Sequence, residues 1–381
     1  MHFKQSFLGA WLVVFASLLS AQENHSYPPL TLGSPAPDFR LKGEDGRTYQ
    51  LKSFARSKLL VIVFTCNHCP TAQAYEERIK QLVVDFKSKG VALLAINPNS
   101  HAAVRLDELG YADLDDTLPS MKIRAKDHQF NFPYVDDGVD QKTAKQYGPV
   151  ATPHVFLFDE ARKLRYQGRI DNNERESLVT HRDAREAIEE LLAGKNVSVP
   201  STKVFGCSTK WDYKAKLNRQ WMEKVQAEPV RLSSASASVL KDLRANPSGK
   251  LRLINVWATW CGPCVSEFDD LIETNLRFRH RDFELITVAA QFPDQEQKVL
   301  SFLQKHHAST QNWIYGSTDS YAMAEAVDPN WNGGLPLTLL IAPNGEVLHR
   351  EVGEIDFLAL RRKIIPALNR ITPWPGMSSA E

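Results

Sequence analysis

The sequence lacks an excess of charge of either sign. Its 381 residues include 46 Lys and Arg against 45 Asp and Glu, which leaves a formal net charge of +1. Nucleic-acid binders and polybasic membrane binders gain much of their affinity from excess positive charge, so we expect no nucleic-acid partner. Hydrophobic residues make up 43% and charged residues 24% of the chain, which is typical of folded globular proteins.

Long apolar runs are also scarce. The one that stands out, Phe7–Ala21, has 15 residues, fewer than the about 20 that a transmembrane helix needs. Lys4 precedes the run and polar residues follow it, which is the pattern of a secretory signal. We predict a signal peptide over 1–21, cleaved near Ala21, and export to the periplasm of a bacterial host. Because Leu19 fits the small-residue cleavage pattern poorly, an uncleaved N-terminal anchor is the alternative.

Cysteine is scarce as well. The chain has five cysteines, a number too small for a disulfide scaffold of this size, and an odd one. Four of them form two C-x-x-C pairs and the fifth stands apart: Cys66 with Cys69, Cys261 with Cys264, and Cys207.

The two pairs fit neither a metal site nor haem attachment. Cys69 and Cys261 lie 192 positions apart, whereas paired zinc motifs are separated by roughly 15–20 residues. Haem attachment needs a histidine after the second cysteine, but Pro70 and Val265 stand there. We expect no metal, and no cofactor other than redox-active disulfides. A static structural disulfide at either pair stays open, although so short a loop constrains the unfolded chain little.

The order of predicted elements repeats in the two halves. Each half has a strand leading into a C-x-x-C pair, a helix with apolar residues at the 3.6-residue period, and a second strand. A later proline opens a third strand, followed by a turn, a fourth strand and a closing helix. The predicted strands are 59–64, 91–96, 154–158 and 163–166, then 251–256, 283–289, 337–341 and 346–349. This pattern predicts mixed sheets flanked by helices.

The length predicts two domains, at about 150 residues each. A segment rich in lysine and without strand patterns separates the two repeats. We predict a first domain over 30–210, a helical linker over 211–229 and a second domain over 230–372.

A C-x-x-C pair between a strand and a helix can form a disulfide reversibly. The free N–H groups and the dipole of the helix stabilise the thiolate of the first cysteine. The second cysteine lies one turn further on, where it can displace a mixed disulfide. We predict that Cys261 attacks and Cys264 resolves in the second pair. In the first pair, we predict that Cys66 attacks and Cys69 resolves.

The residues between the cysteines differ between the pairs. His68 can hydrogen-bond to, or pair with, the Cys66 thiolate, which would stabilise the reduced form and make that disulfide the more oxidising. Pro263 and its neighbour Gly262 offer no such side chain. We therefore predict that the second pair is the stronger reductant.

The second half carries Trp260-Cys261-Gly262-Pro263-Cys264, with Leu335-Pro336 following more than seventy residues later. With this motif it resembles a thioredoxin-fold domain of the periplasmic TlpA/ResA-like type. The resemblance implies that Pro336 is cis and faces the cysteines, and that the backbone at Leu335 pairs with a bound peptide. An ordinary strand-edge proline is the alternative.

The same resemblance raises a question about proton transfer. Thioredoxin-fold domains often keep a buried acid six residues before the first cysteine, where this chain has Asn255. Glu267, one turn along the helix from Cys264, is the predicted substitute. A solvated helix charge is the alternative interpretation of Glu267.

The first half is similar to the peroxiredoxin-like (AhpC/TSA, redoxin) branch of the same superfamily. The resemblance rests on four segments: 33–39, 64–70, Tyr147-Gly148 before Thr152-Pro153, and the tail 205–211. Together the two resemblances imply an α/β protein of two thioredoxin-like folds in tandem, each a central mixed sheet flanked by helices. They also imply a second cis-proline, Pro153, with a substrate-binding backbone at Thr152.

Peroxiredoxins carry a hydroxyl residue three positions before the peroxidatic cysteine. Val63 stands three before Cys66, and Cys66 itself stands three before Cys69. The peroxide-activating pattern is therefore absent. For Cys207 two interpretations stay open, an inert buried thiol and a third redox thiol near Cys66 and Cys69.

We predict an exported thiol–disulfide oxidoreductase that acts on protein disulfides through two C-x-x-C centres. Its partners are protein thiols and disulfides, with a membrane or periplasmic protein as candidate electron donor, recognised through grooves beside Pro153 and Pro336. A thiol peroxidase activity of the first domain and a non-catalytic protein-binding module are the alternatives.

Overall fold

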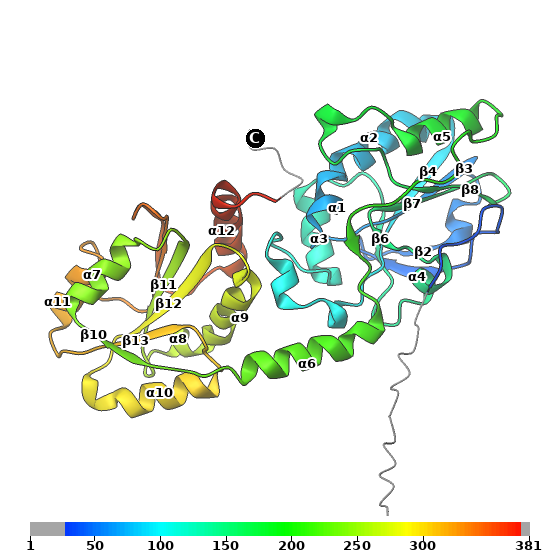
Figure 1. The fold of residues 1–381 in the computed structure, drawn as a ribbon. Helices are drawn as coiled ribbons and strands as arrows, with labels where there is room; N and C mark the ends of the chain where they lie inside the picture. The colour runs from blue at the N-terminus through cyan, green and yellow to red at the C-terminus, as the bar shows by residue number, and fades with distance from the viewer. Residues whose placement is uncertain (1–26, 375–381) are drawn as a thin grey trace, which may run out of the picture.

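The structure, a computed structural model, describes residues 27–374 (Figure 1). The predicted signal peptide lies outside these residues. No helix between residues 27 and 374 is long and apolar enough to cross a membrane.

Two mixed sheets organise the chain, as predicted. The first has the strand order β2-β1-β5-β4-β3-β7-β8 and the second β10-β13-β12-β11-β14-β15. In the first sheet the strands are β1 (Arg40–Gly43), β2 (Thr48–Gln50), β3 (Leu59–Phe64), β4 (Val91–Asn97), β5 (Tyr134–Asp136), β7 (His154–Phe158) and β8 (Leu164–Gly168). In the second they are β10 (Ser233–Ala235), β11 (Leu251–Trp257), β12 (Phe283–Ala289), β13 (Gln311–Tyr315), β14 (Leu337–Ile341) and β15 (Val347–Val352).

Helices pack around both sheets (Figure 1). The first half contains α1 (Pro70–Ala74), α2 (Glu76–Phe86), α3 (Leu118–Asp127), α4 (Lys142–Tyr147) and α5 (Asp183–Leu192). The second contains α7 (Ala237–Ala245), α8 (Gly262–Ser266), α9 (Phe268–Phe278), α10 (Glu296–Lys305), α11 (Ser320–Val327) and α12 (Phe357–Ile371). The helix α6 (Ala215–Gln226) runs between the two halves, as expected, but starts after a 3-10 turn rather than at Trp211.

The central strands hold the cysteine segments. Every residue of β3 and of β11 is buried, since helices cover both faces of each sheet. In each sheet the central strand runs parallel to one neighbour, β4 or β12, and antiparallel to the other, β7 or β14. The chain therefore leaves a rigid, fully packed strand just before each cysteine pair.

The segment between β4 and β5 also joins the two halves. The carbonyl oxygen of Gly110 accepts a hydrogen bond from Arg281 at 3.0 Å, and that of Ala112 accepts one from Arg277 at 3.2 Å. Both arginines belong to the second half of the chain. Asp113 pairs with Arg362 of α12 at 2.8 Å. Figure 1 shows this cyan segment against α9 and α12.

Candidate redox sites

The second cysteine pair lies where the sequence predicts it. Cys261 directly precedes α8, and its sulfur accepts a hydrogen bond from the backbone N–H of Cys264 at 3.3 Å. The two cysteines form a disulfide and both are buried. Trp260, just before them, is 66% exposed and forms part of the surface beside the pair. Pro263 stands in the first turn of α8, a position that suits proline because the N–H there has no helical partner.

Both predicted cis-prolines are confirmed. The peptide bonds Thr152–Pro153 and Leu335–Pro336 are cis. Leu335 packs against the apolar cluster that contains Cys261 and Cys264. Thr152 places its Oγ1 3.2 Å from the Cys66 sulfur. The role of these residues in binding substrate stays a prediction.

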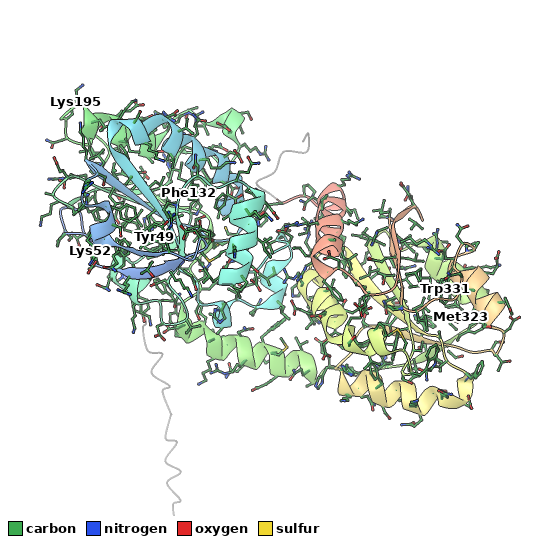
Figure 2. All side chains as sticks on the ribbon, turned by 180° about the vertical axis from the view of Figure 1, so that it is seen from behind. Tyr49, Lys52, Phe132, Lys195, Met323 and Trp331 are labelled. Carbon is green, nitrogen blue, oxygen red and sulfur yellow. A yellow bond between two sulfur atoms is a disulfide. The ribbon has the colours of Figure 1, made fainter. Side chains whose placement is uncertain are left out.

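An apolar pocket of about 180 Å³ is lined by Trp260, the residue before Cys261, and by Leu335, the residue before the cis-proline Pro336. Its lining includes Met323 and Trp331, which Figure 2 labels. Aromatic and apolar side chains dominate the wall, chiefly Trp260, Phe292, Tyr315, Met323, Trp331 and Leu335. Such a surface suits an apolar side chain of a partner protein.

Glu267 is not a solvated helix charge. It joins α8 to α9, is only 8% exposed, and its Oε2 accepts a hydrogen bond from the Ile355 N–H at 3.0 Å. Its Oε1 has no hydrogen-bond partner among the described residues. Burial, helped by the charges of Glu354 and Glu351, raises the pKa of Glu267 to about 7. Asn255 is buried and donates to the Thr338 hydroxyl.

We expect Glu267→Gln to remove a pH dependence. A carboxyl with a pKa near 7 changes from proton donor to acceptor as the pH rises through 7, so deprotonation of Cys264 should speed up over that range. Protein disulfide reduction by the wild type should therefore rise across pH 6–8, as the pKa of about 7 requires, and the variant should lose this inflection. The exposed Asp269→Asn, two positions further along the same segment, is the matched control. An unchanged pH profile in Glu267→Gln would remove Glu267 from the proton path.

The C-x-x-C motifs align Cys66 with Cys261, but the pairing of the strands aligns a different cysteine with Cys261. Phe64 pairs with His154, the residue after Pro153. Val256 pairs with Leu337, the residue after Pro336. Phe64 and Val256 therefore hold equivalent places in the two sheets. Counting five residues onward from each leads to Cys69 in the first half and to Cys261 in the second.

The prediction that the Cys66 sulfur lies over the helix is wrong. Cys69 is the residue that precedes α1, and its sulfur accepts a hydrogen bond from the Ala72 N–H at 3.4 Å. This is the contact that Cys261 makes with the N–H of Cys264. Ala72 thus stands where the second half has its resolving cysteine, and Cys66 lies three residues before the helix-capping position.

The Cys69 sulfur is also surrounded by further donors. It accepts a hydrogen bond from the Cys207 N–H at 3.3 Å, and when protonated it can donate to the Thr152 carbonyl oxygen, also 3.3 Å away. Burial raises the pKa of Cys69, but hydrogen bonds from Cys207 and Cys66 and the charge of His68 outweigh burial, so the pKa lies well below that of an ordinary thiol. Burial raises the pKa of Cys66 well above it. Cys69 is the thiol that ionises first.

His68 pairs with an aspartate rather than with the Cys66 thiolate, which corrects the prediction for this residue. Its Nδ1 lies 2.6 Å from Oδ2 of Asp116. Burial lowers the pKa of His68, but the Asp116 carboxylate reverses this and raises it. Burial raises the pKa of Asp116, but His68 and several donors lower it overall. Asp116 therefore favours the protonated form of His68, whose positive charge lowers the pKa of Cys69.

Asp116 anchors the loop between the first two cysteines. Its Oδ1 accepts the backbone N–H groups of Asn67 at 2.9 Å and of His68 at 3.0 Å, and its Oδ2 accepts from Asn99 at 2.8 Å. Sequence reasoning missed Asp116, because it lies 48 positions from His68 in a segment without a recognisable motif. Cys66, His68 and Asp116 offer ligand atoms within 4.8 Å of one another. The hydrogen bonds that Asp116 accepts account for its position in this cluster without a metal ion.

Cys207 is half-buried beside the first pair. It packs against the cluster of Cys66, Cys69 and Ala72. Its strand, β9 (Cys207–Ser208), pairs antiparallel with β6 (Ala151–Thr152). The groove that we predicted beside Pro153 for a partner is thus occupied by the chain itself.

Comparisons with known proteins follow the two halves. Residues 32–167 match the AhpC/TSA family and residues 222–357 match the Redoxin family. The thiol:disulfide interchange protein CycY of Rhizobium leguminosarum bv. viciae is 30% identical over 156 residues, which are 39% of this chain and 74% of that protein. The chain belongs to the thiol–disulfide oxidoreductases of the thioredoxin superfamily, with two redoxin-type domains in tandem.

Other proteins similar to this oxidoreductase cover different fractions of its chain. The thiol-disulfide oxidoreductase ResA of Bacillus cereus is 27% identical over 134 residues, covering 35% of this chain and 68% of ResA. A solved hypothetical protein from Sinorhizobium meliloti 1021 is 33% identical, covering 48% of this chain and 96% of its own, with a TM-score of 0.43.

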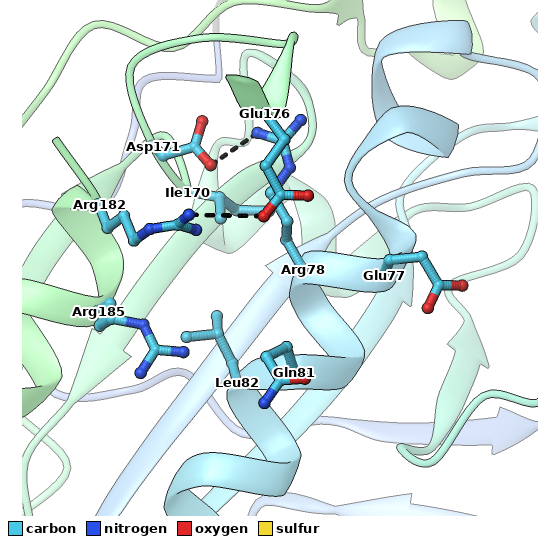
Figure 3. Close-up of a pocket in the computed structure, with 9 residues that line it drawn as sticks. All are labelled: Glu77, Arg78, Gln81, Leu82, Ile170, Asp171, Glu176, Arg182 and Arg185. Carbon is cyan, nitrogen blue, oxygen red and sulfur yellow. Dashed lines mark hydrogen bonds and ion pairs between the residues drawn. The ribbon is translucent and has the colours of Figure 1, made fainter. Parts of the chain in front are cut away.

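A second pocket in the oxidoreductase's first domain, of about 180 Å³, has no cysteine among its lining residues, which Figure 3 shows. Three arginines line it, and each is paired within the protein. Arg78 binds Asp171 at 2.7 Å, Arg182 binds Glu176 at 3.5 Å, and Arg185 binds Asp85. Among its described lining residues, the pocket therefore offers no free cation for an anionic ligand.

Proposed function

We propose that this oxidoreductase exchanges disulfides with other proteins through two centres. Cys261 attacks a substrate disulfide, and Cys264 then displaces the mixed disulfide. The observation that supports this most is the place of Cys261: its sulfur accepts the Cys264 N–H in the first turn of α8, and its neighbour Trp260 is exposed and lines an apolar pocket. These are the features that a thiolate nucleophile and a docking site for a polypeptide require.

The first centre works from Cys69 rather than from Cys66. Its sulfur caps α1 and accepts two backbone N–H groups, which stabilises the thiolate and therefore the reduced form. We propose domain bounds of 30–210 and 230–372, joined by a linker over 211–229. The predicted signal over 1–21 would place both centres outside the cytoplasm, where a periplasmic or membrane protein would supply electrons.

A peroxidase activity is the competing function, and the match of residues 32–167 to the AhpC/TSA family favours it. Three positions before Cys69, where peroxiredoxins carry a hydroxyl residue, this chain has Cys66. The Cys66 sulfur lies 3.2 Å from the Thr152 hydroxyl, so a hydroxyl is present but comes from another strand.

Two assays on the full chain separate these functions. With dithiothreitol as electron source, we expect the wild type to speed up reduction of insulin disulfides, and to consume hydrogen peroxide no faster than a variant without cysteines. Peroxide turnover that disappears in Cys69→Ser would instead establish the peroxidase. If neither substrate turns over while a partner binds the cysteine-free variant equally well, the chain is a binding module.

A further inference from the structure

The first domain holds one of its own segments against the backbone before its cis-proline. Thr152 pairs with Cys207 and Ala151 pairs with Ser208 in an antiparallel ladder, extended by a hydrogen bond from the Thr209 N–H to the Val150 carbonyl oxygen. In the second domain, the equivalent Leu335 belongs to no strand within residues 27–374. The first domain therefore fills, with its own chain, the place that the second leaves open beside its cysteines.

The segment fits this place closely. A Cβ atom on Gly206 would lie 2.1 Å from the Thr152 carbonyl oxygen, and Gly206 has a φ of +132°. Only glycine allows both this backbone conformation and this approach. The approach brings the Cys207 N–H to 3.3 Å from the Cys69 sulfur and packs the Cys207 side chain against Cys66 and Cys69.

We propose that residues 206–208 act as a built-in substrate strand, and that Cys207 exchanges a disulfide with Cys69. Cys207 is then the sulfur through which the first domain reacts with partner thiols. The inference rests on the proposed function, because partner thiols and disulfides supply and accept the electrons.

The exchange balances as a two-electron reaction. A partner thiolate attacks the Cys207 sulfur of the Cys69–Cys207 disulfide, the bond between the two sulfurs breaks, and Cys69 leaves as a thiolate. A second partner thiolate attacks the partner's sulfur in the mixed disulfide and releases Cys207, which takes up a proton. The domain disulfide is reduced to two thiols, and two partner thiols are oxidised to one disulfide.

Exposure and leaving-group chemistry favour this order of attack. Cys66 and Cys69 are 2% and 0% exposed, whereas Cys207 is only half-buried. A partner thiolate therefore reaches Cys207 first. Cys69 leaves readily, since the N–H groups of Ala72 and Cys207 stabilise its negative charge.

Disulfide mapping on the full chain tests the proposal. The protein is equilibrated with mixtures of reduced and oxidised dithiothreitol, quenched with acid, alkylated, digested with trypsin and analysed by mass spectrometry. We expect the peptide that contains Cys69 to be linked to the peptide that contains Cys207. The link should persist in Cys66→Ser, which removes the other candidate sulfur, and should disappear in Cys69→Ser. A wild type that forms only the Cys66–Cys69 disulfide, with Cys207 alkylated, would overturn the proposal.

A second variant tests the strand itself while keeping every cysteine. Gly206→Ala should push residues 206–208 away from Thr152 and reduce the yield of the Cys69–Cys207 link at least several-fold. Gly194→Ala is the control, because Gly194 also has a positive φ, of +73°, but a Cβ there meets no atom within 4 Å. Equal yields in the two variants would contradict the fit that we describe.

Insulin reduction measured on the same preparations separates the two proposals. If insulin is reduced but no link to Cys207 forms, the built-in strand is wrong and the proposed function stands. If the link forms but insulin is not reduced, the proposed function is wrong at the second centre while the strand stands.

Discussion

The Cys261→Ser variant should lose at least about 100-fold of the rate of insulin reduction, since loss of a nucleophile removes most of an enzyme's rate. Serine cannot form the mixed disulfide that the reaction passes through. Cys261 is the sulfur that accepts a backbone N–H, that of Cys264, in the first turn of α8, and Cys264 is 1% exposed, so Cys264 cannot replace it as the attacking sulfur. The rate of insulin precipitation with dithiothreitol measures the loss.

Cys264→Ser should behave differently. Its Cys261 can still attack, but the mixed disulfide is not resolved within the domain. When the reduced variant is freed of dithiothreitol before insulin is added, a covalent complex with an insulin chain should therefore accumulate and be visible by mass spectrometry. The exposed Ser266→Ala, in the same helix, is the matched control and should keep the wild-type rate. If Cys261→Ser reduced insulin at close to the wild-type rate, the reductase activity would have to come from the first domain.

Asp116→Asn should destabilise the first cysteine site by about 3–5 kcal/mol near pH 6, the usual cost of breaking a buried ion pair. The Asp116 carboxylate is fully buried, pairs with His68 at 2.6 Å and accepts two backbone N–H groups. An asparagine cannot replace all of these acceptors and leaves the imidazolium unpaired. Hydrogen exchange of residues 64–75, followed by mass spectrometry, measures the local free energy of opening.

The pH dependence of this loss follows from the two pKa directions. The pKa of Asp116 is lowered by folding, so its contribution is present above the unfolded value of about 4 and fades as the pH falls through the folded one. The pKa of His68 is raised by folding, so its contribution is present below about 6.5 and fades as the pH rises through the folded value. The difference between wild type and variant should therefore be largest between these limits.

The exposed Asp140→Asn provides the control for this experiment. The Asp140 side chain is 71% exposed, and its ion pair with Lys142 is long, at 3.9 Å. Its loss should therefore change the opening free energy by less than about 0.5 kcal/mol. A similarly small effect of Asp116→Asn would show that the buried pair does not hold the cysteine loop.

The fold was largely predictable because its strands are continuous apolar runs bounded by turns. The predicted strands 154–158, 283–289 and 337–341 coincide with β7, β12 and β14. Others, such as β15, differ at their ends, where hydrogen bonding to a neighbouring strand rather than hydrophobicity decides the limit.

The second site followed from its sequence because Cys261 both begins the motif and precedes the helix. In the first half these two roles separate. The spacing of two cysteines three positions apart indicates that their sulfurs are close. It does not indicate at which residue the helix begins. Pro70 indicates where the helix begins, because proline favours the first helical position. The helix α1 does begin at Pro70, directly after Cys69.

The rest of the first site depends on contacts between distant segments. Asp116 contacts His68, between the two cysteines, across 48 positions of sequence, and Cys207 contacts Cys69 across 138. No local pattern encodes such a contact, because it arises only when the segment after β4 and the tail after α5 fold onto the sheet. Gly206 before Cys207 is the one local sign, and its meaning is visible only with the Thr152 carbonyl oxygen beside it.

A redox titration of the wild-type chain tests the central claim most directly. The chain is equilibrated over a range of dithiothreitol ratios, and its free thiols are trapped and assigned by mass spectrometry. We predict two separate two-electron couples, one from Cys261 and Cys264 and one that includes Cys69. The couple with Cys69 should have the higher potential, because the Cys69 sulfur accepts hydrogen bonds from the N–H groups of Ala72 and Cys207, whereas the Cys261 sulfur accepts one from Cys264, and such bonds stabilise the thiolate of the reduced form. A single couple from Cys261 and Cys264, with Cys66, Cys69 and Cys207 remaining thiols throughout, would contradict the account.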